Sequence, residues 1–193
     1  VIDPIPSNNF RLAFIGFSGA GKSVAMNNLV LRFLRGAFDA IYLISPSLIA
    51  DETCRFLVQF AGEHNCFEEY DDSIIDGILD LQRRAKENGN MGHVLICVDD
   101  FIGELKQNAK VWSLFTKARH YNCSIIINSQ AWKKIMPVAR AQLTHIAYFR
   151  QGNQRELEKF IDEVLVNFCG NKKKAQELYL RATYKKYSFA FCD

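Results

Sequence analysis

The glycine-rich segment at residues 16–23, with the sequence GFSGAGKS, constrains the fold of this chain more than any other feature. It directly follows a short apolar run at residues 12–15 and precedes a stretch with helical periodicity. Its glycines allow the backbone to curl so that successive N–H groups point inward, at the positive end of the following helix. The segment therefore predicts a phosphate-binding loop between a strand and a helix, rather than a glycine-rich turn that binds nothing.

Each residue type in this phosphate loop (residues 16–23) has an expected role. Lys22 is expected to reach the β- and γ-phosphates of ATP, and Ser23 to hold Mg²⁺. The expected nucleotide-binding residues are Gly16, Phe17, Ser18, Gly19, Ala20, Gly21, Lys22, Ser23 and Val24.

Length and composition indicate one globular domain with a substantial core. The chain has 193 residues, of which 49% are hydrophobic and 23% charged. We expect an extended segment at residues 1–9, rich in proline and asparagine, and a single domain at residues 10–193. Apolar runs are too short for a membrane span, and the start at Val1 without a signal segment favours a partial sequence over a secreted one.

Charge and cysteine usage exclude several classes of site. The net charge of +3 gives no electrostatic signal for nucleic acid over the whole chain, so any contact with DNA must be local. The six cysteines have no C-x-x-C spacing and the four histidines are isolated. We therefore expect reduced thiols and no zinc site.

Short apolar runs alternate with amphipathic stretches along the chain. Strands are expected at residues 10–15, 40–44, 93–98, 124–128, 143–149 and 187–191, with a brief one at 66–67. Helices are expected at residues 22–34, 51–61, 72–86, 112–120, 155–168 and 172–181, the first with Val24, Leu29, Val30, Phe33 and Leu34 on its buried face. This alternation predicts an α/β fold, a three-layer sandwich around a mainly parallel sheet.

Two carboxylates follow the apolar strand at residues 93–98. Hydrolysis of a nucleotide needs one carboxylate in the Mg²⁺ shell and another that orients or deprotonates water. We assign Asp99 to Mg²⁺ and Asp100 to the water, with Glu104 as an alternative base. The competing interpretation is that the two aspartates only cap a turn.

A further polar residue, Gln130, follows the next strand and is expected at the same sheet edge. Its amide is placed to contact the γ-phosphate or the attacking water, and a surface glutamine with no such role is the alternative. Hydrolysis through charge stabilisation commonly also needs an arginine, often from a neighbouring subunit. Arg119, Arg140, Arg150 and Arg155 lie near this half of the predicted sheet.

Taken together, these segments resemble the poxvirus-type genome-packaging ATPases of the FtsK/HerA superfamily, which occur in large DNA viruses and virophages. The resemblance rests on residues 10–23, 41–46, 94–100, 118–130 and 140–145, in that order along the chain. It implies a RecA-like P-loop NTPase fold and a motor that hydrolyses ATP to ADP and phosphate. The motor would push double-stranded DNA into a preformed capsid.

The resemblance also implies partners and a place in the cell. The expected assembly is a homo-oligomeric ring, a pentamer or hexamer, at a capsid or portal-like vertex, in the host cytoplasm or the virion. Superfamily members place an arginine of one subunit at the ATP of its neighbour. Arg155 and Arg140 rank ahead of Arg119 for this catalytic role, Arg155 by its place in the helix after the strand at residues 143–149.

Two loops are candidates for contact with DNA phosphates, which lysines bind without reading sequence. They are residues 103–110, with Lys106 and Lys110, and residues 130–137, with Trp132, Lys133 and Lys134. The alternative is that these lysines only face solvent. For a second basic region, residues 172–174 with Lys185 and Lys186, the solvated face is the favoured interpretation.

Two other functions stay open at this point. A nucleoside or small-molecule kinase would share the phosphate loop, but the arginine-rich lid and acceptor pocket of such kinases are not evident. An ATP-gated ring-assembly module without motor activity would bind the nucleotide only. Lys22, Asp99, Asp100 and Gln130 together argue against it, because a protein that only binds needs no group to orient water.

Overall fold

The protein is built on a seven-stranded sheet, seen in a computed structural model that describes residues 9–48, 50–100, 105–106 and 108–193. The strand order is β3-β2-β4-β5-β1-β6-β7, and each neighbouring pair is parallel except β6 with β7. The strands are β1 (Arg11–Ile15), β2 (Ala40–Ile44), β3 (Cys66–Phe67), β4 (Val94–Val98), β5 (Cys123–Ser129), β6 (His145–Phe149) and β7 (Phe189–Cys192).

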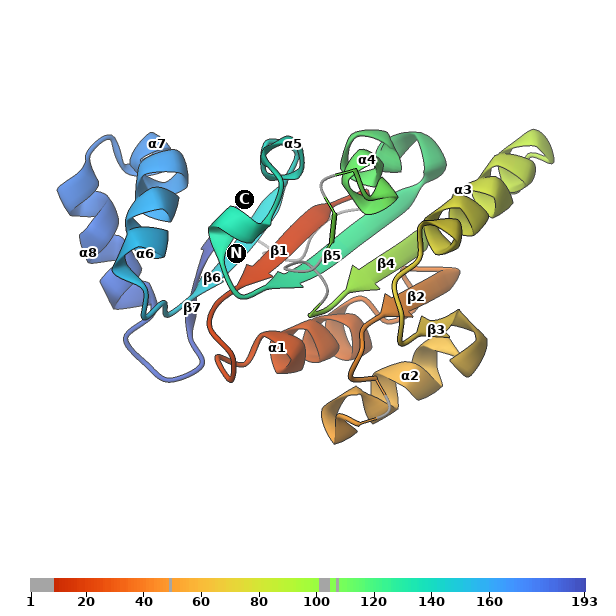
Figure 1. Ribbon diagram of the computed structural model, residues 1–193, viewed down its shortest axis with the longest axis horizontal. Coiled ribbons are helices and arrows are strands. Elements are labelled where there is room, and N and C mark those ends of the chain that lie inside the picture. Colours follow the sequence, from red (N-terminus) through yellow and green to blue (C-terminus); the bar gives the residue numbers. More distant parts are fainter. Residues whose placement is uncertain (1–8, 49, 101–104, 107) are drawn as a thin grey trace.

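Helices cover both faces of this sheet (Figure 1). On one face lie α1 (Lys22–Asn28), which continues as a π-helical turn (Leu29–Phe33), and α2 (Arg55–Ala61). On the other lie α3 (Asp72–Glu87), α4 (Lys110–Lys117), α5 (Pro137–Arg140), α6 (Gln154–Phe160), which continues through a π-helical turn (Ile161–Leu165) into α7 (Val166–Cys169), and α8 (Lys172–Ala182). The predicted three-layer α/β sandwich with a mainly parallel sheet is confirmed.

The alternation of side chains along the central strands gives each helical layer its own core. In β5, Ile126 packs into the cluster under α1 and α2, whereas Ile125 and Ile127 pack into the cluster under the other helices. All three are fully buried. Such continuous apolar strands are expected where a parallel sheet is covered on both faces. None of the helices in the described ranges is long and apolar enough to cross a bilayer.

Some details of the predicted elements are wrong, such as the strand expected at residues 143–149, which begins at His145. Val24 and Phe33, expected on the buried face of the first helix, are 49% and 61% exposed. Val30 and Leu34 are buried as predicted, and together with Met26 they form a stripe at intervals of four residues. The last strand begins at Phe189 rather than at residue 187, because Tyr187 has a φ of +67°, which an extended strand does not allow.

The strand order determines where the loops meet. β1 lies between β5 and β6, and β5 separates β1 from β4, so that the carboxyl ends of these parallel strands share one edge. The phosphate loop begins at this edge, where the N–H of Gly16 donates to the carbonyl of Ser129 over 3.1 Å. The expected neighbour of the phosphate-loop strand, the strand containing Ser124, is thereby confirmed.

Candidate functional site

The phosphate loop has the backbone geometry that its sequence predicts. Gly19 and Gly21 adopt φ values of +76° and +98°, which other residues rarely tolerate. Within the described part of the chain, the N–H groups of Gly19, Gly21, Lys22, Ser23 and Val24 donate to no acceptor. A row of open N–H donors at a helix start forms a site for an anion such as phosphate.

Lys22 is held inside this loop rather than extended into solvent. Its side chain is buried, and its ammonium donates to the carbonyls of Gly16 (3.0 Å) and Phe17 (3.2 Å). Burial lowers the pKa of Lys22, and the nearby carboxylates of Asp99 and Asp100 oppose that shift. The cation therefore lies beside the open N–H donors, where phosphate oxygens can replace the two carbonyls as its partners.

Asp99 and Ser23 meet at the end of β4. The Ser23 hydroxyl donates to Oδ2 of Asp99 over 2.8 Å, while Oδ1 of Asp99 is buried and accepts no hydrogen bond from the described residues. Burial raises the pKa of Asp99, as does the adjacent Asp100, whereas the hydrogen bond from Ser23 and the charge of Lys22 lower it. The Asn128 amide also lowers it, from a position near the carboxylate but outside hydrogen-bond geometry. An orphaned carboxylate oxygen next to a hydroxyl fits a hydrated Mg²⁺.

The donor set is also limited in number, which bears on the kind of metal. No group of three or more His, Cys, Asp or Glu side chains converges anywhere in the described ranges. Mg²⁺ typically takes one or two protein ligands and fills its shell with water and substrate phosphates. The pair Ser23 and Asp99 fits that pattern and does not fit a zinc site.

Asp100 points toward the same space from a strained backbone. Its φ is +61°, a left-handed conformation that aspartate adopts more readily than most residues, and its side chain is exposed. A cavity of about 610 Å³ is lined by Lys22, Ser23, Asp100 and Gln130 among others. The structure thus places Lys22, Ser23, Asp100 and Gln130 around one cavity, and Asp99 reaches it only through its hydrogen bond with Ser23.

Gln130 is connected to the next loop of the sheet edge. The amide of Gln151, which follows β6, donates to the backbone carbonyl of Gln130 over 3.2 Å. Tyr179 in α8 in turn accepts from the N–H of Gln151 over 2.8 Å. The loop that carries the sensor candidate is therefore bonded to the segment that precedes α6.

The arginines lie in three different settings. Arg119 lies just before β5, at the edge of the sheet opposite the phosphate loop. It is close to Arg11, whose pKa is lowered first by burial and then by the charge of Arg119. Arg150 and Arg155 follow β6 at the edge of the phosphate loop, both exposed. Arg155 lies in the first turn of α6 and forms no ion pair with described residues.

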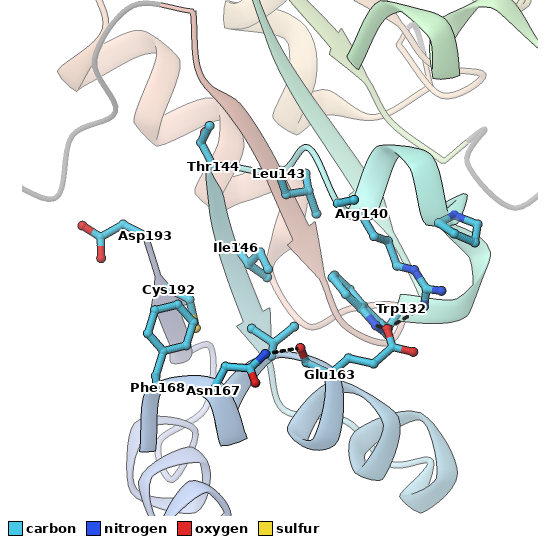
Figure 2. A pocket seen from close by; sticks show the side chains of 13 residues that line it. Trp132, Arg140, Leu143, Thr144, Ile146, Glu163, Asn167, Phe168, Cys192 and Asp193 are labelled. Atoms are coloured by element: carbon cyan, nitrogen blue, oxygen red, sulfur yellow. Dashed lines mark hydrogen bonds and ion pairs between the residues drawn. The ribbon is translucent and has the colours of Figure 1, made fainter. Parts of the chain in front are cut away.

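Arg140 has partners within its own chain (Figure 2). Its side chain is only 13% exposed, and its guanidinium pairs with Glu163 over 3.0 Å. It also lies 5.3 Å from the centroid of the Trp132 ring, whose indole N–H donates to Glu163 over 2.6 Å. These three side chains line a second cavity of about 650 Å³, and Glu163 pairs there with Lys159 as well, over 3.4 Å.

The candidate DNA loops are only partly available. Trp132 is buried and so is wrongly placed among the DNA-contacting residues, because its ring packs on Phe160 and Arg140. Lys133 pairs with Glu156 over 3.3 Å, and Lys110 pairs with Asp76. Lys106 and Lys134 are exposed and form no ion pair in the described ranges, while Glu104 lies outside the described residues.

Sequence reasoning missed several residues of the first cavity. Asp51, Thr53 and Tyr187 also line it. Asp51 already serves as a helix cap, accepting from the N–H (2.9 Å) and hydroxyl (2.7 Å) of Thr53. Tyr187 carries no motif, and its only sequence signal is an aromatic residue after two lysines, ahead of the last apolar run.

A comparison with protein-family models matches residues 3–176 to the family described as Poxvirus A32 protein. This match covers most of the chain and confirms the resemblance to poxvirus-type proteins. Two relatives share about a quarter of their residues with it: the uncharacterized protein 015R of Frog virus 3 (isolate Goorha), 26% identical over 95% of the chain, and the uncharacterized protein 075L of Invertebrate iridescent virus 6, 25% over 83%. The aligned regions span 56% and 60% of these relatives.

Solved structures share the fold. The DNA-packaging ATPase B204 of Sulfolobus turreted icosahedral virus superposes with a TM-score of 0.68 at 18% identity, covering 96% of this chain and 92% of that one. B204 of Sulfolobus turreted icosahedral virus 2, in complex with ATP-gammaS, gives 0.64 at 15% identity over 100% and 94%. EssC (ATPases 2 and 3) of Geobacillus thermodenitrificans gives 0.60 at 15% identity over 79% and 34%.

Proposed function

Because the chain belongs to the poxvirus A32 protein family, we propose that it is the ATP-hydrolysing domain of a motor that moves double-stranded viral DNA into a preformed capsid. The observation that carries this proposal is the convergence of Lys22, Ser23, Asp100 and Gln130 on one cavity, with Asp99 behind Ser23. A loop that only binds phosphate needs no carboxylate and amide facing the same space.

We assign a different role in ATP hydrolysis to each polar residue at the cavity. The open N–H donors of the loop and the Lys22 ammonium bind the β- and γ-phosphates, and Ser23 with Asp99 would hold Mg²⁺. A bound Mg²⁺ would neutralise part of the negative charge on the phosphates. The carboxylate of Asp100 accepts the proton of the water as its oxygen attacks the γ-phosphorus and the bond to the leaving ADP breaks.

The positions of Asp100 and Gln130 support these roles. The left-handed backbone at Asp100 is a strained conformation of the kind that concentrates at functional sites. Gln130 lines the cavity, and its backbone carbonyl accepts a hydrogen bond from the Gln151 side chain. A movement of Gln130 caused by a change at the γ-phosphate would therefore also move the segment before α6. Gln130 is therefore our candidate for the group that orients water and reports the state of the nucleotide.

We assign the trans-acting arginine to Arg155. It lies at the carboxyl edge of the sheet, its side chain is exposed, and it has no ion-pair partner in the described ranges. Arg140 would have to leave Glu163 and Trp132 to act on a neighbour, and Arg119 lies at the far edge. Such a contribution requires a neighbouring subunit, and we propose a homo-oligomeric ring with five or six members.

For DNA we propose Lys106 and Lys134, which follow β4 and β5 and therefore lie downstream of Asp100 and Gln130 in the chain. Their ammonium groups are exposed and can pair with phosphates without reading base sequence. The proposed setting is virion assembly in the cytoplasm of an infected cell, with a capsid or portal-like vertex as partner.

The experiment that tests this function measures phosphate release from ATP with and without double-stranded DNA. We expect hydrolysis that DNA stimulates in the wild type and that is lost in Lys22→Ala, because the loop then has no cation for the γ-phosphate. Lys86→Ala, which removes an exposed lysine of α3 that forms no ion pair with described residues, is the matched control and should retain activity. Absence of hydrolysis at high protein concentration with DNA would contradict the proposal.

A further inference from the structure

The segment between α8 and β7 lies beside the phosphate loop, although the two are far apart in the sequence (Figure 1). The Tyr187 ring is so close to Gly21 that a β-carbon added there would lie 3.2 Å from Cδ1 of the ring. Tyr187 also lines the first cavity, together with Lys22 and Ser23. None of the roles described above uses this ring.

Tyr187 is presented to the cavity in an unusual way. Its backbone has a φ of +67°, which a bulky residue rarely adopts, so its surroundings hold it there. Although it contacts the loop, the residue remains 58% exposed. A large ring on a strained backbone, exposed by more than half and lining a cavity, is more typical of a ligand contact than of a packed core residue.

Two further features indicate the chemistry of that ligand. Lys186 places its ammonium 4.7 Å from the centroid of the Tyr187 ring, and the cavity also contains Val24, which is 49% exposed. The cavity therefore combines phosphate-binding groups with an aromatic and an aliphatic surface. A nucleotide has the matching parts, a charged chain of phosphates and a planar base. The cavity volume of about 610 Å³ is also typical of a site that binds a small molecule.

We propose that Tyr187 stacks on the purine base of the bound nucleoside triphosphate. The phosphate loop then binds one end of the ligand and the segment before β7 binds the other. Because every base presents a π-face, a ring of this kind contributes affinity with little discrimination among bases. The inference rests on the proposed binding of ATP at the phosphate loop and adds the part of the site that contacts the base.

The test compares a ligand that has a base with one that has none. Binding of a non-hydrolysable ATP analogue and of inorganic tripolyphosphate, both with Mg²⁺, is measured by titration calorimetry. For Tyr187→Ala and Tyr187→Gly we expect about tenfold weaker binding of the ATP analogue and unchanged binding of tripolyphosphate. Tyr187→Gly guards against misfolding, because glycine adopts the required φ without strain.

Two controls complete the experiment. Tyr187→Phe keeps the ring and should bind the ATP analogue as the wild type does. Tyr184→Ala removes an 82% exposed tyrosine of the same segment and should change neither affinity. Wild-type affinity for the ATP analogue in Tyr187→Gly would overturn the inference, as would an equal loss for both ligands. A wild-type chain that binds neither ligand would overturn the proposed function and this inference with it.

Discussion

Two cavities of similar volume, about 610 Å³ at the phosphate loop and about 650 Å³ between α5 and α7, differ in what their polar groups contact. In the second, Arg140 and the Trp132 indole both bind the carboxylate of Glu163. At the phosphate loop, an oxygen of Asp99 and several N–H groups have no partner among the described residues. The two cavities do not differ in size, and each has a buried polar atom without a hydrogen-bond partner, Asp99 Oδ1 in one and Arg140 Nη1 in the other. They differ in that Arg140 is ion-paired to Glu163, whereas the phosphate loop has a row of open N–H donors.

The difference also separates two kinds of charged residue. A guanidinium already neutralised within its chain contributes to stability, and one without a partner is available to a ligand or a neighbouring subunit. Arg140 belongs to the first kind and Arg155 to the second. The predictions below test this division, from the largest expected effect to the smallest.

The largest effect is expected for Arg155→Ala, which should lower the rate of ATP hydrolysis by about 1,000-fold without weakening ATP binding. The reason is that the arginine would stabilise the transition state at a neighbouring subunit. Mixing inactive Arg155→Ala subunits with Asp100→Asn subunits should restore part of the activity, since some interfaces then combine an intact arginine with an intact aspartate. Absence of rescue would remove Arg155 from the trans role, and Arg140→Ala would be the next partner to mix.

Asp100→Asn should slow hydrolysis by about 100-fold or more while ATP still binds, because the amide cannot accept the proton of the water. Phosphate release and calorimetric titration measure the two quantities. Asp51→Asn is the matched control within the same cavity: Oδ1 of Asp51 already accepts both hydrogen bonds from Thr53, an arrangement that an asparagine oxygen can keep, so we expect less than about a twofold change. Equal losses in both variants would mean that Asp100 has no special role.

Arg140→Ala tests the second cavity. It should lower the free energy of unfolding by about 1–2 kcal/mol, because the variant loses the ion pair and the contact with Trp132. Hydrolysis per folded molecule should change by less than about twofold. Urea unfolding and phosphate release distinguish the outcomes. A large loss of activity at unchanged stability would reverse the division between Arg140 and Arg155.

Asp99→Asn should stabilise the nucleotide-free protein by about 1 kcal/mol at neutral pH, because it removes a buried charged oxygen without a partner. Burial raises the pKa of Asp99 in the folded protein above that of the unfolded chain. The wild type therefore loses stability as pH rises from about 4 through the raised pKa, and the loss is complete above it.

The variant should lack this part of the pH dependence. Urea midpoints at about pH 4 and about pH 7.5 measure it for both proteins. A wild type whose stability does not fall between these values relative to Asp99→Asn would contradict the raised pKa.

The sequence predicted the sheet and the phosphate loop because both depend on local patterns. Apolar runs of five residues give buried strands such as β4, and the spacing of Gly19, Gly21 and Lys22 gives the loop. The pair Asp99 and Asp100 was found because it ends such a run. In each of these features, the residues with the functional side chains and the residues that set their position are only a few apart in the sequence.

The remaining features depend on tertiary contacts that no local pattern carries. Tyr187 reaches Gly21 only because β7 runs antiparallel to β6, which brings the preceding segment to the phosphate-loop edge. Trp132 follows a strand end like Gln130 but is buried by Phe160 in α6. Which arginine is neutralised likewise depends on Glu163, in a helical turn far along the chain.

The measurement that tests the central claim most directly is a structure of the wild type with Mg²⁺ and a non-hydrolysable ATP analogue. The phosphates should lie in the cavity at the phosphate loop, with the Lys22 ammonium moved from the carbonyls of Gly16 and Phe17 to phosphate oxygens. The Arg140, Trp132 and Glu163 contacts should be unchanged. A nucleotide bound in the second cavity, or a Lys22 that keeps both carbonyls with the analogue present, would contradict the account.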